Sequence, residues 1–452
     1  MDPKNMRGEW HMSDNETHET KVEEMEAKVE NNEARIIKID NLSPRQIMEL
    51  DVCTRCGECS VWCPVYDQDK RETVNPRGRA RWFKKIIKSQ YGLFRPGTVW
   101  GKMLRRKPVT EEEIKAFTND LYECSTCRQC YVACPVQIDT VELWESMRRS
   151  IVDSGYGPLE QQKALAISVK SYDNPWQQPR SSRSRWTKLA LKDKKVAKEP
   201  KDITKTKAEV LYYVGCTASY DVNVKEVAIS DAHILERANV DYGILGPKEK
   251  CCGSVLLRVG DHEYERIAEE NIKMFNDLGI KTLITSCAGC YKTIKQDYAK
   301  VGKLNFEVKH MVEFLLDLIR EGKLQFKKEL KMKVTYHDPC HLGRHSGVYD
   351  APREILRAIP GIELVEMERS RENSRCCGAG GGLKAGFPDI QNQMAQKRVK
   401  EAEAVGASVI VSACPFCYQG LQIGIQALNS PLKMMDITEI VTMALDGTEE
   451  KQ

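Results

Sequence analysis

The sequence predicts a mixed fold, α+β and α/β, in which a helical cysteine-rich domain precedes two pseudo-symmetric repeats of Rossmann-like βα units. Three observations carry this prediction. Two runs of the form C-x2-C-x2-C-x3-C-P lie in the first third of the chain, a five-cysteine pattern recurs later with nearly constant spacing, and strand-like and helix-like patterns alternate around it. A chain of 452 residues also exceeds what one hydrophobic core usually serves.

Composition divides the chain into five parts. We expect a mobile acidic segment at 1–42, a cysteine-rich domain with a basic insertion at 43–170, a basic linker rich in Pro, Ser and Lys at 171–207, and repeats at 208–323 and 331–446. No apolar run approaches the roughly 18 residues that cross a bilayer, and the first 51 residues have no signal-like segment. The chain is therefore expected to be soluble and cytoplasmic, where its 18 cysteines favour metal binding over disulfides.

The two N-terminal runs, "CTRCGECSVWCP" and "CSTCRQCYVACP", predict a two-cluster ferredoxin domain. In such domains three close thiolates hold one cubane [4Fe–4S] cluster, and the fourth reaches across to the other. Structural zinc sites are the alternative, but they rarely use this spacing. We assign one cluster to Cys53, Cys56, Cys59 and Cys134, and the second to Cys124, Cys127, Cys130 and Cys63.

The chain has a net charge of +4, which conceals two basic stretches. Residues 70–107 hold 13 Lys and Arg against one acid, and residues 180–207 hold 11 against three, so the rest of the chain carries −16 (+4 minus +12 minus +8). The first stretch interleaves Trp82, Phe83, Phe94 and Trp100 with its cations, as a segment on a membrane surface or a membrane subunit would. A plain solvated face is the alternative, and the acidic remainder opposes nucleic acid binding.

The internal repeat pairs ten cysteines at offsets of 124 to 127 residues: Cys216, Cys251, Cys252, Cys287 and Cys290 with Cys340, Cys376, Cys377, Cys414 and Cys417. β-rich runs lead directly into these cysteines, so parallel strands should converge five thiols at the carboxyl edge of each sheet. Zinc or a cubane cluster would use four thiols, and five fit a larger or distorted cluster. The glycines after each adjacent pair should let the backbone approach closely and leave room for a reactant. Metal-free burial of the cysteines is the alternative.

These motifs, C-x(34)-CCG-x(33)-C-x2-C and C-x(35)-CCG-x(35)-C-x2-C, resemble the CCG domains of the heterodisulfide reductase family. Together with the double ferredoxin run, they resemble its D subunit over residues 43–446. Within that family, "NPRGRARW" and "CSTCRQCYVACPVQIDT" are most similar to the catalytic subunit of the membrane redox complex linked to dissimilatory sulfite reduction.

The resemblance implies that each complete CCG motif holds a noncubane [4Fe–4S] cluster at which disulfide sulfurs are cleaved or formed, so one or two such clusters are expected. The second repeat is expected to be catalytic because "CCGAGGG" and "HDPCH" match the reactive site better than "CCGSVLL" does. Its site residues are Cys340, Cys376, Cys377, Cys414 and Cys417 with His341, while His337, Arg344 and His345 are weaker candidates.

The resemblance also implies partners: a membrane haem b subunit that takes electrons from quinol, a small cysteine-bearing sulfur-carrier protein whose disulfide or trisulfide is reduced, and possible other iron–sulfur subunits. The chain would then sit peripherally at the inner face of the cytoplasmic membrane and bind no nucleic acid. Two alternatives stay open, the iron–sulfur subunit of a glycolate or lactate oxidase and a pure electron relay.

Overall fold

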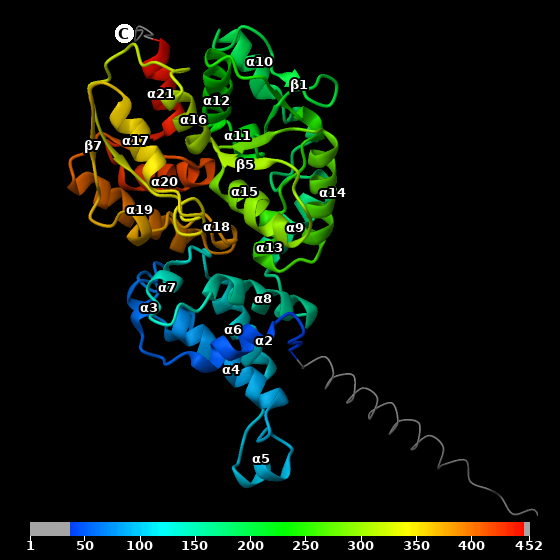
Figure 1. Cartoon of the computed structure of the whole chain (residues 1–452). Helices are drawn as coiled ribbons and strands as arrows, with labels where there is room; N and C mark the ends of the chain where they lie inside the picture. The colour runs from blue at the N-terminus through cyan, green and yellow to red at the C-terminus, as the bar shows by residue number, and fades with distance from the viewer. Residues whose placement is uncertain (1–36, 447–452) are drawn as a thin grey trace, which may run out of the picture.

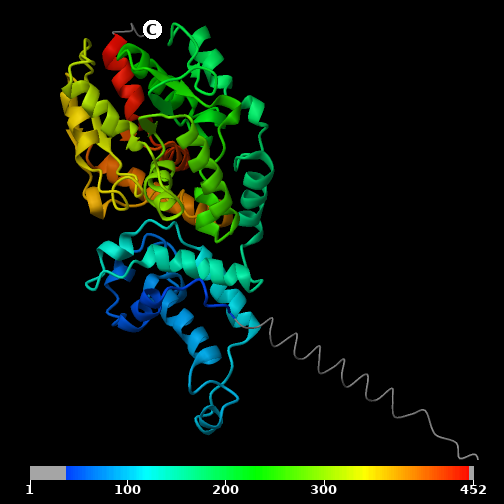
Figure 2. The ribbon, with the colours of Figure 1, turned by 45° about the vertical axis from the view of Figure 1, so that its right-hand side comes forward.

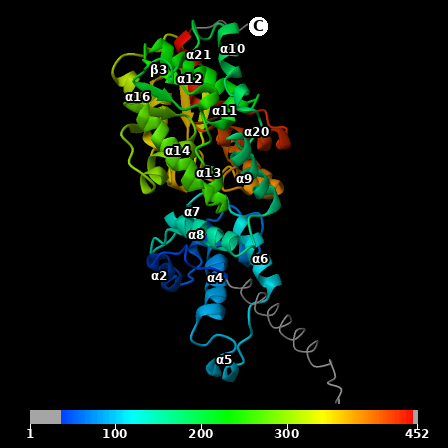
Figure 3. The same cartoon turned by 90° about the vertical axis from the view of Figure 1, so that its right-hand side faces the viewer.

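The computed structural model describes residues 37–446. A helical domain lies at one end of the molecule and two parallel sheets with their helices lie side by side at the other (Figure 1). The views in Figures 2 and 3 show that the helical domain meets the sheet-containing body along a broad boundary. The mixed helix and parallel-sheet fold expected from the sequence is confirmed.

The helical domain forms because the basic insertion supplies helices between the two cysteine runs. Capping boxes start two of its helices, at Ser43 with Gln46 and at Thr110 with Glu113. Its core includes Phe83, which stacks on Phe117 at 5.9 Å. The helices are α2 (Pro44–Val52), α3 (Glu58–Val61), α4 (Pro76–Tyr91), α5 (Val99–Met103), α6 (Glu111–Tyr122), α7 (Gln129–Val132) and α8 (Thr140–Asp153), with a 3-10 turn, η1 (Glu72–Val74).

The first repeat is a five-stranded parallel sheet in the order β1-β3-β2-β4-β5. Its strands are β1 (Lys201–Asp202), β2 (Val210–Tyr212), β3 (Tyr242–Ile244), β4 (Thr282–Thr285) and β5 (Glu307–His310). Its helices are α9 (Glu160–Tyr172), α10 (Arg185–Lys192), α11 (Cys216–Tyr220), α12 (Lys225–Arg237), α13 (Ser254–Val259), α14 (Glu263–Asp277), α15 (Ala288–Lys292) and α16 (Met311–Arg320), with short turns at Arg180–Ser182, Gly246–Lys248, Thr293–Asp297 and Tyr298–Lys300.

The second repeat is a four-stranded parallel sheet in the order β7-β6-β8-β9. Its strands are β6 (Met332–Tyr336), β7 (Ile362–Val365), β8 (Val409–Ser412) and β9 (Lys433–Asp436). Its helices are α17 (Asp350–Ala358), α18 (Leu383–Gly386), α19 (Pro388–Ala404), α20 (Pro415–Leu428) and α21 (Ile437–Asp446), with a turn at Arg371–Asn373. Without β1, the first sheet has the same strand order as the second.

The central strands explain where the cysteines lie. β2, β4 and β8 are almost wholly buried, as strands covered by helices on both faces must be. Cys216, Cys287, Cys340 and Cys414 follow the carboxyl ends of β2, β4, β6 and β8 closely. The two repeats pack together through α12 against α21 and α16 against α17, so the carboxyl edges of both sheets are held in one body.

Two of the expected segment boundaries differ from the structure. Residues 1–36 of the expected mobile segment lie outside the described residues, but Ile37 is fully buried and its carbonyl accepts a hydrogen bond from Tyr91 at 2.9 Å. The expected linker 171–207 is also packed: Trp186 of α10 is buried edge-on against Tyr212, and β1 extends the first sheet. Its many lysines conceal an amphipathic helix whose apolar face lies on α12.

Within residues 37–446, we find no helix that combines the length and the apolar composition needed to cross a membrane.

Candidate metal centres

Each set of four ferredoxin-type cysteines lines a common cavity. Cys53, Cys56, Cys59 and Cys134 line the first, and Cys63, Cys124, Cys127 and Cys130 line the second. Cys130 also borders the first cavity, so the two cavities are neighbours. The crossed arrangement, in which the fourth cysteine of each run joins the other run's set, is the one that the spacing predicts.

Matched left-handed turns wrap the two loops around these cavities. Arg55 and Gly57 in the first run have positive φ angles, and so do Thr126 and Arg128 at the corresponding positions of the second. Three of these four residues have side chains, for which this conformation costs roughly 1 kcal/mol or more each. The same strained geometry occurs twice, which indicates a loop shaped around what it encloses.

The protonation of these thiols indicates which ligand would fit. Burial, together with the neighbouring thiols, raises the pKa of Cys59 to about 12. Burial likewise raises the pKa of Cys63 to about 12. The charge of Arg79 beside Cys63 does not offset this burial. Bound iron would supply the positive charge that balances the thiolate forms. The cavities and their donors fit iron–sulfur clusters.

The five thiols of the first repeat form a connected group. The Sγ atoms of Cys252 and Cys290 are 3.5 Å apart, and Cys216 and Cys251 share a hydrogen bond. Hydrogen bonds from Cys251 and Cys290 lower the pKa of Cys252 to about 6. The second cysteine of the adjacent pair is thus the thiolate at the centre of the group.

The second repeat shares part of this pattern. The Sγ atoms of Cys377 and Cys417 are 3.4 Å apart, and Cys340 and Cys376 share a hydrogen bond. Hydrogen bonds from Cys376 and Cys417 lower the pKa of Cys377 well below its ordinary value. Hydrogen bonds from neighbouring thiols also lower the pKa of Cys376 and of Cys414, whereas the pKa values of their counterparts Cys251 and Cys287 are raised. The second repeat therefore stabilises thiolates at more positions than the first.

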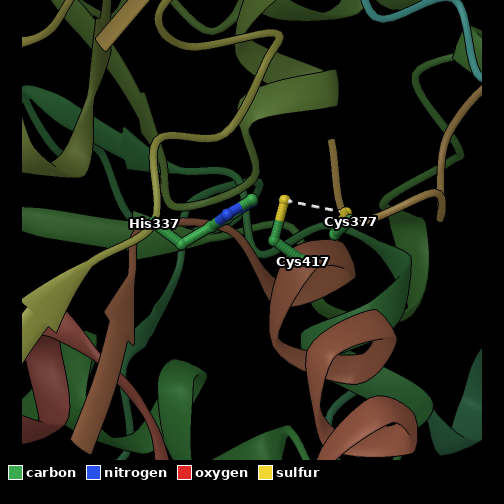
Figure 4. A group of neighbouring side chains, drawn as sticks. All are labelled: His337, Cys377 and Cys417. Carbon is green, nitrogen blue, oxygen red and sulfur yellow. Dashed lines mark hydrogen bonds between the residues drawn. The ribbon is translucent and has the colours of Figure 1, made fainter. Parts of the chain in front are cut away.

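A histidine joins the second group. A ring nitrogen of His337 and the sulfurs of Cys377 and Cys417 all lie within 4.8 Å of one another (Figure 4). Arg398 donates a hydrogen bond from Nε to His337 Nδ1 at 3.2 Å, so the proton of the neutral ring is on Nε2. Burial lowers the pKa of His337 to about 3, which keeps the ring neutral. In the first repeat, Tyr213 occupies the equivalent position.

His341 and His345 lie beside Cys340, stacked with ring centroids 4.4 Å apart. His341 Nδ1 is 3.4 Å from the Cys340 sulfur, and its Nε2 is buried without a hydrogen-bond partner. His345 Nε2 is 3.0 Å from the carbonyl of Thr126 in the second cysteine run. Burial lowers the pKa of His341 to about 3. His341 thus touches the cysteine group, whereas His345 contacts the ferredoxin-type domain.

Three of the four sets of cysteines are also linked across domain boundaries. Cys127 of the second ferredoxin-type set shares a hydrogen bond with Cys376 of the second repeat. Cys414 of the second repeat shares a hydrogen bond with Cys287 of the first. The second repeat therefore has sulfur contacts in two directions, toward the ferredoxin-type domain and toward the first repeat.

The glycines of the second repeat allow the close backbone approach that the sequence predicts. A side chain on Gly378 would meet Gln391 of α19 at 3.1 Å, and one on Gly381 would meet the Cys124 carbonyl at 2.4 Å. The run "GAGGG" thus lets the loop of the ferredoxin-type domain approach the second repeat. The close approach expected of these glycines is thus made between two parts of the protein.

Buried arginines lie where the domains meet, and of these the sequence singled out only Arg344. Arg148 of α8 is fully buried and donates to carbonyls of both repeats, at Arg258 (2.7 Å) and Gly381 (2.9 Å). Arg344 Nε donates to the Cys127 carbonyl at 2.7 Å, and Arg183 pairs with Glu249 beside Cys216. No periodic pattern marks these residues, since each makes contacts distant in sequence.

The aromatic residues of the first basic stretch separate into two groups. Phe83 is in the core and Trp82 is half-buried under Lys85, so neither is available for the surface role expected of the stretch. Phe94 and Trp100 are exposed.

Comparison with known families agrees with this division of the chain. A family described as "4Fe-4S dicluster domain" matches residues 49–138, and the CCG family, described as "Cysteine-rich domain", matches residues 210–295 and 334–422. Both families indicate [4Fe–4S] clusters.

Three relatives show how far the similarity extends. The D subunit of the dihydromethanophenazine:CoB–CoM heterodisulfide reductase of Methanosarcina mazei is 38% identical over 92% of this chain and 98% of its own length. A probable iron-sulfur-binding oxidoreductase, FadF, of Bacillus subtilis is 34% identical over 92% of this chain and 62% of its own length. The EtfAB:quinone oxidoreductase of Syntrophomonas wolfei is 31% identical over 90% of this chain and 60% of its own length. The chain belongs to the family of heterodisulfide reductase D subunits and is an iron–sulfur oxidoreductase subunit.

Proposed function

We propose that this subunit receives electrons from a quinol-linked membrane haem b partner and uses them to reduce a disulfide or trisulfide on a small cysteine-bearing sulfur-carrier protein. When bound, two cubane [4Fe–4S] clusters in the ferredoxin-type domain and noncubane [4Fe–4S] clusters in the CCG repeats would supply the electron transfer and the sulfur chemistry. The similarity to a relative named as a heterodisulfide reductase supports the reaction class.

Two contacts between cysteines of different sets carry the proposal. Cys127 contacts Cys376, and Cys414 contacts Cys287. These contacts join the second ferredoxin-type set to the second repeat and the second repeat to the first, and Cys130 of the second set also lines the first ferredoxin-type cavity. We assign Cys53, Cys56, Cys59 and Cys134 to one cubane site, Cys124, Cys127, Cys130 and Cys63 to the other, and the ten repeat cysteines to two noncubane sites.

The chain's own residues would supply three things at these sites. Arg183 and Arg344 place buried positive charge beside the cysteines of the first and second repeat, respectively. His337 offers a neutral ring to Cys377 and Cys417, and His341 offers an unpartnered ring nitrogen beside Cys340. Cleavage of an S–S bond consumes two electrons and two protons, so His341 is our candidate for passing a proton to a departing sulfur.

Electron entry is proposed at the first ferredoxin-type cavity. Cys56 is exposed there, unlike Cys127 and Cys130 of the second set. Val136 lines the same cavity, and Met48 and Val52 lie exposed on α2, the helix that ends at Cys53. An exposed ligand with an apolar rim suits docking of a redox partner, which in this proposal is the haem subunit at the inner membrane face.

The order of the sulfur contacts bears on which repeat carries out the disulfide chemistry. If the first repeat only conducted electrons to the second, it would lie between the second repeat and the ferredoxin-type domain. The sulfur contacts instead put the second repeat in that position. We therefore expect the second repeat to be essential, and we expect activity lost with the first repeat to reflect chemistry rather than conduction.

The test compares two matched double variants, Cys376→Ser with Cys377→Ser and Cys251→Ser with Cys252→Ser, in anaerobically purified protein. Iron content should be about 16 per chain in the wild type, four for each of four clusters, and about 12 in either variant. Variants of the second repeat should lose disulfide turnover while a quinol-linked donor still reduces the cubane clusters. Normal turnover by that variant, with its cubane EPR signals intact, would refute catalysis at this site.

A second candidate, a relay without its own substrate, is favoured by the similarity to the EtfAB:quinone oxidoreductase, whose name describes electron transfer to quinone. EPR of the oxidised protein separates the two functions. A disulfide-reducing centre should change its signal when a thiol is added, whereas a relay should keep both repeat signals unchanged. The oxidase alternative would instead require a flavin-containing partner to co-purify.

A further inference from the structure

The connection between α4 and α6, residues 92–110, projects from the helical domain as an arm that carries α5 (Figure 1). Figure 3 shows the same arm extending away from the two sheets. Its tip is an ordered element: Thr98 caps α5 by accepting a hydrogen bond from the Gly101 backbone at 3.0 Å, and the Arg106 backbone donates to the Gly101 carbonyl at 2.9 Å. The arm therefore presents its side chains in a fixed arrangement.

The arm exposes apolar side chains that the rest of the domain does not cover. Val99 is 80% exposed, Leu93 72%, Met103 64% and Trp100 53%, and Phe94 and Leu104 are also exposed. Val99, Trp100 and Met103 share one face of α5, because residues one and four positions apart lie within about 100° around a helix. A contiguous apolar face of this kind indicates a surface that is covered when the protein works.

The arm is also cationic. Arg95, Lys102, Arg105, Arg106 and Lys107 lie within it or at its base, and residues 73–110 contain no Asp or Glu. In the described part of the chain, none of these five cations has a carboxylate within ion-pair distance. Their charge is left for an anionic partner.

We propose that the arm docks on anionic phospholipid, with the apolar face of α5 at the boundary between headgroups and acyl chains and the cations on the phosphates. Apolar residues that include a Trp, beside uncompensated Lys and Arg, are the composition of interfacial helices. A protein partner would more often meet a patch whose centre is depleted of charge. The inference rests on the proposed function in one respect, the membrane location of the electron donor.

The experiment measures co-sedimentation of the full-length chain with protein-free vesicles. Vesicles of phosphatidylglycerol and phosphatidylcholine in equal parts are compared with vesicles of phosphatidylcholine alone, at low and high salt. We expect binding to the anionic vesicles that falls with salt. Arg105→Gln with Arg106→Gln should weaken it about 30-fold, from roughly 1 kcal/mol per cation. Trp100→Ser with Met103→Ser should weaken binding at both salt concentrations.

Two control variants match these changes elsewhere on the surface. Lys192→Gln with Lys194→Gln removes two exposed cations of the second basic stretch, and Val222→Ser removes an apolar side chain that is 73% exposed. Equal losses in the controls, no preference for anionic lipid, or no binding to the protein-free vesicles would overturn the proposal. Because these vesicles contain no redox protein, such a failure leaves the cysteine-variant test of disulfide reduction unaffected.

Discussion

Replacement of Arg148 by methionine tests how the ferredoxin-type domain is held against the repeats. The guanidinium is fully buried and makes six hydrogen bonds to carbonyls of three parts of the molecule. The acceptors are the carbonyls of Leu121, Tyr122, Cys124, Arg258 and Gly381. Methionine fills a similar volume and donates none of these bonds.

The expected loss of stability follows from the backbone carbonyls that remain without a hydrogen-bond donor in the variant. Leu121 and Tyr122 end α6, where carbonyls lack partners within the helix. Each buried carbonyl left without a donor costs about 1–3 kcal/mol. Because the variant also removes a buried cation, part of this destabilisation is offset. We therefore expect the free energy of unfolding to fall by about 3–5 kcal/mol in total. With a urea dependence of about 3 kcal/mol per M, the unfolding midpoint should fall by about 1–1.7 M.

The assay is urea unfolding of the cluster-loaded, full-length chain under anaerobic conditions, followed by tryptophan fluorescence after a fixed incubation. Arg266→Met is the control, because Arg266 is half exposed and pairs with Glu263 and Glu270 on the surface of α14. Such surface pairs contribute about 1 kcal/mol or less, so its midpoint should shift by about 0.3 M at most. An Arg148→Met midpoint that shifts no further than this control would refute the reasoning.

Three further predictions concern the backbone, the histidine and a buried acid. Gly381→Ala should lower the urea midpoint far more than Gly406→Ala, since both glycines have positive φ but only the first would press a side chain onto a backbone oxygen, at 2.4 Å. Equal shifts would exclude the clash as the cause. His337→Phe should lower the midpoint potential of the second-repeat centre by about 60 mV in an EPR redox titration, because a hydrogen-bond donor near the sulfurs favours the reduced state. An unchanged potential would show that the ring donates nothing there. Burial raises the pKa of Asp231 from 3.8 to about 7, so the folded chain keeps a proton that the unfolded chain releases in this range. Stability should therefore fall as pH rises through that window, and Asp231→Asn should reduce the fall in urea midpoint between about pH 5 and pH 7. A variant as pH-dependent as the wild type would contradict that assignment.

The features that could be predicted from the sequence are those with a local signature. Cysteine spacing identified the two ferredoxin-type runs and the repeat, and alternating strand and helix patterns identified the parallel sheets. Cys216 and Cys340 were placed at strand ends because parallel sheets bring those ends to one edge.

The rest depends on contacts between distant residues. The expected linker contains Trp186, whose burial depends on Tyr212 and α12 rather than on its Lys-rich neighbours. Gly381 looks like a residue that makes room for a ligand until the Cys124 carbonyl is found beside it. The composition around Phe83 predicts an exposed basic stretch, but its ring stacks on Phe117, which is more than thirty residues away in the sequence. Composition averages over such residues, and only the packed structure separates them.

The contact between Cys414 and Cys287 has a consequence for assembly, because both residues belong to one polypeptide and only residues 321–331 connect α16 to β6. The two repeats are always present in a one-to-one ratio, and neither has to find the other by diffusion. Their effective concentration is set by the fold and not by expression level. If electrons pass between the repeats as proposed, dilution of the purified protein should leave that transfer unchanged and slow only the encounters with separate molecules.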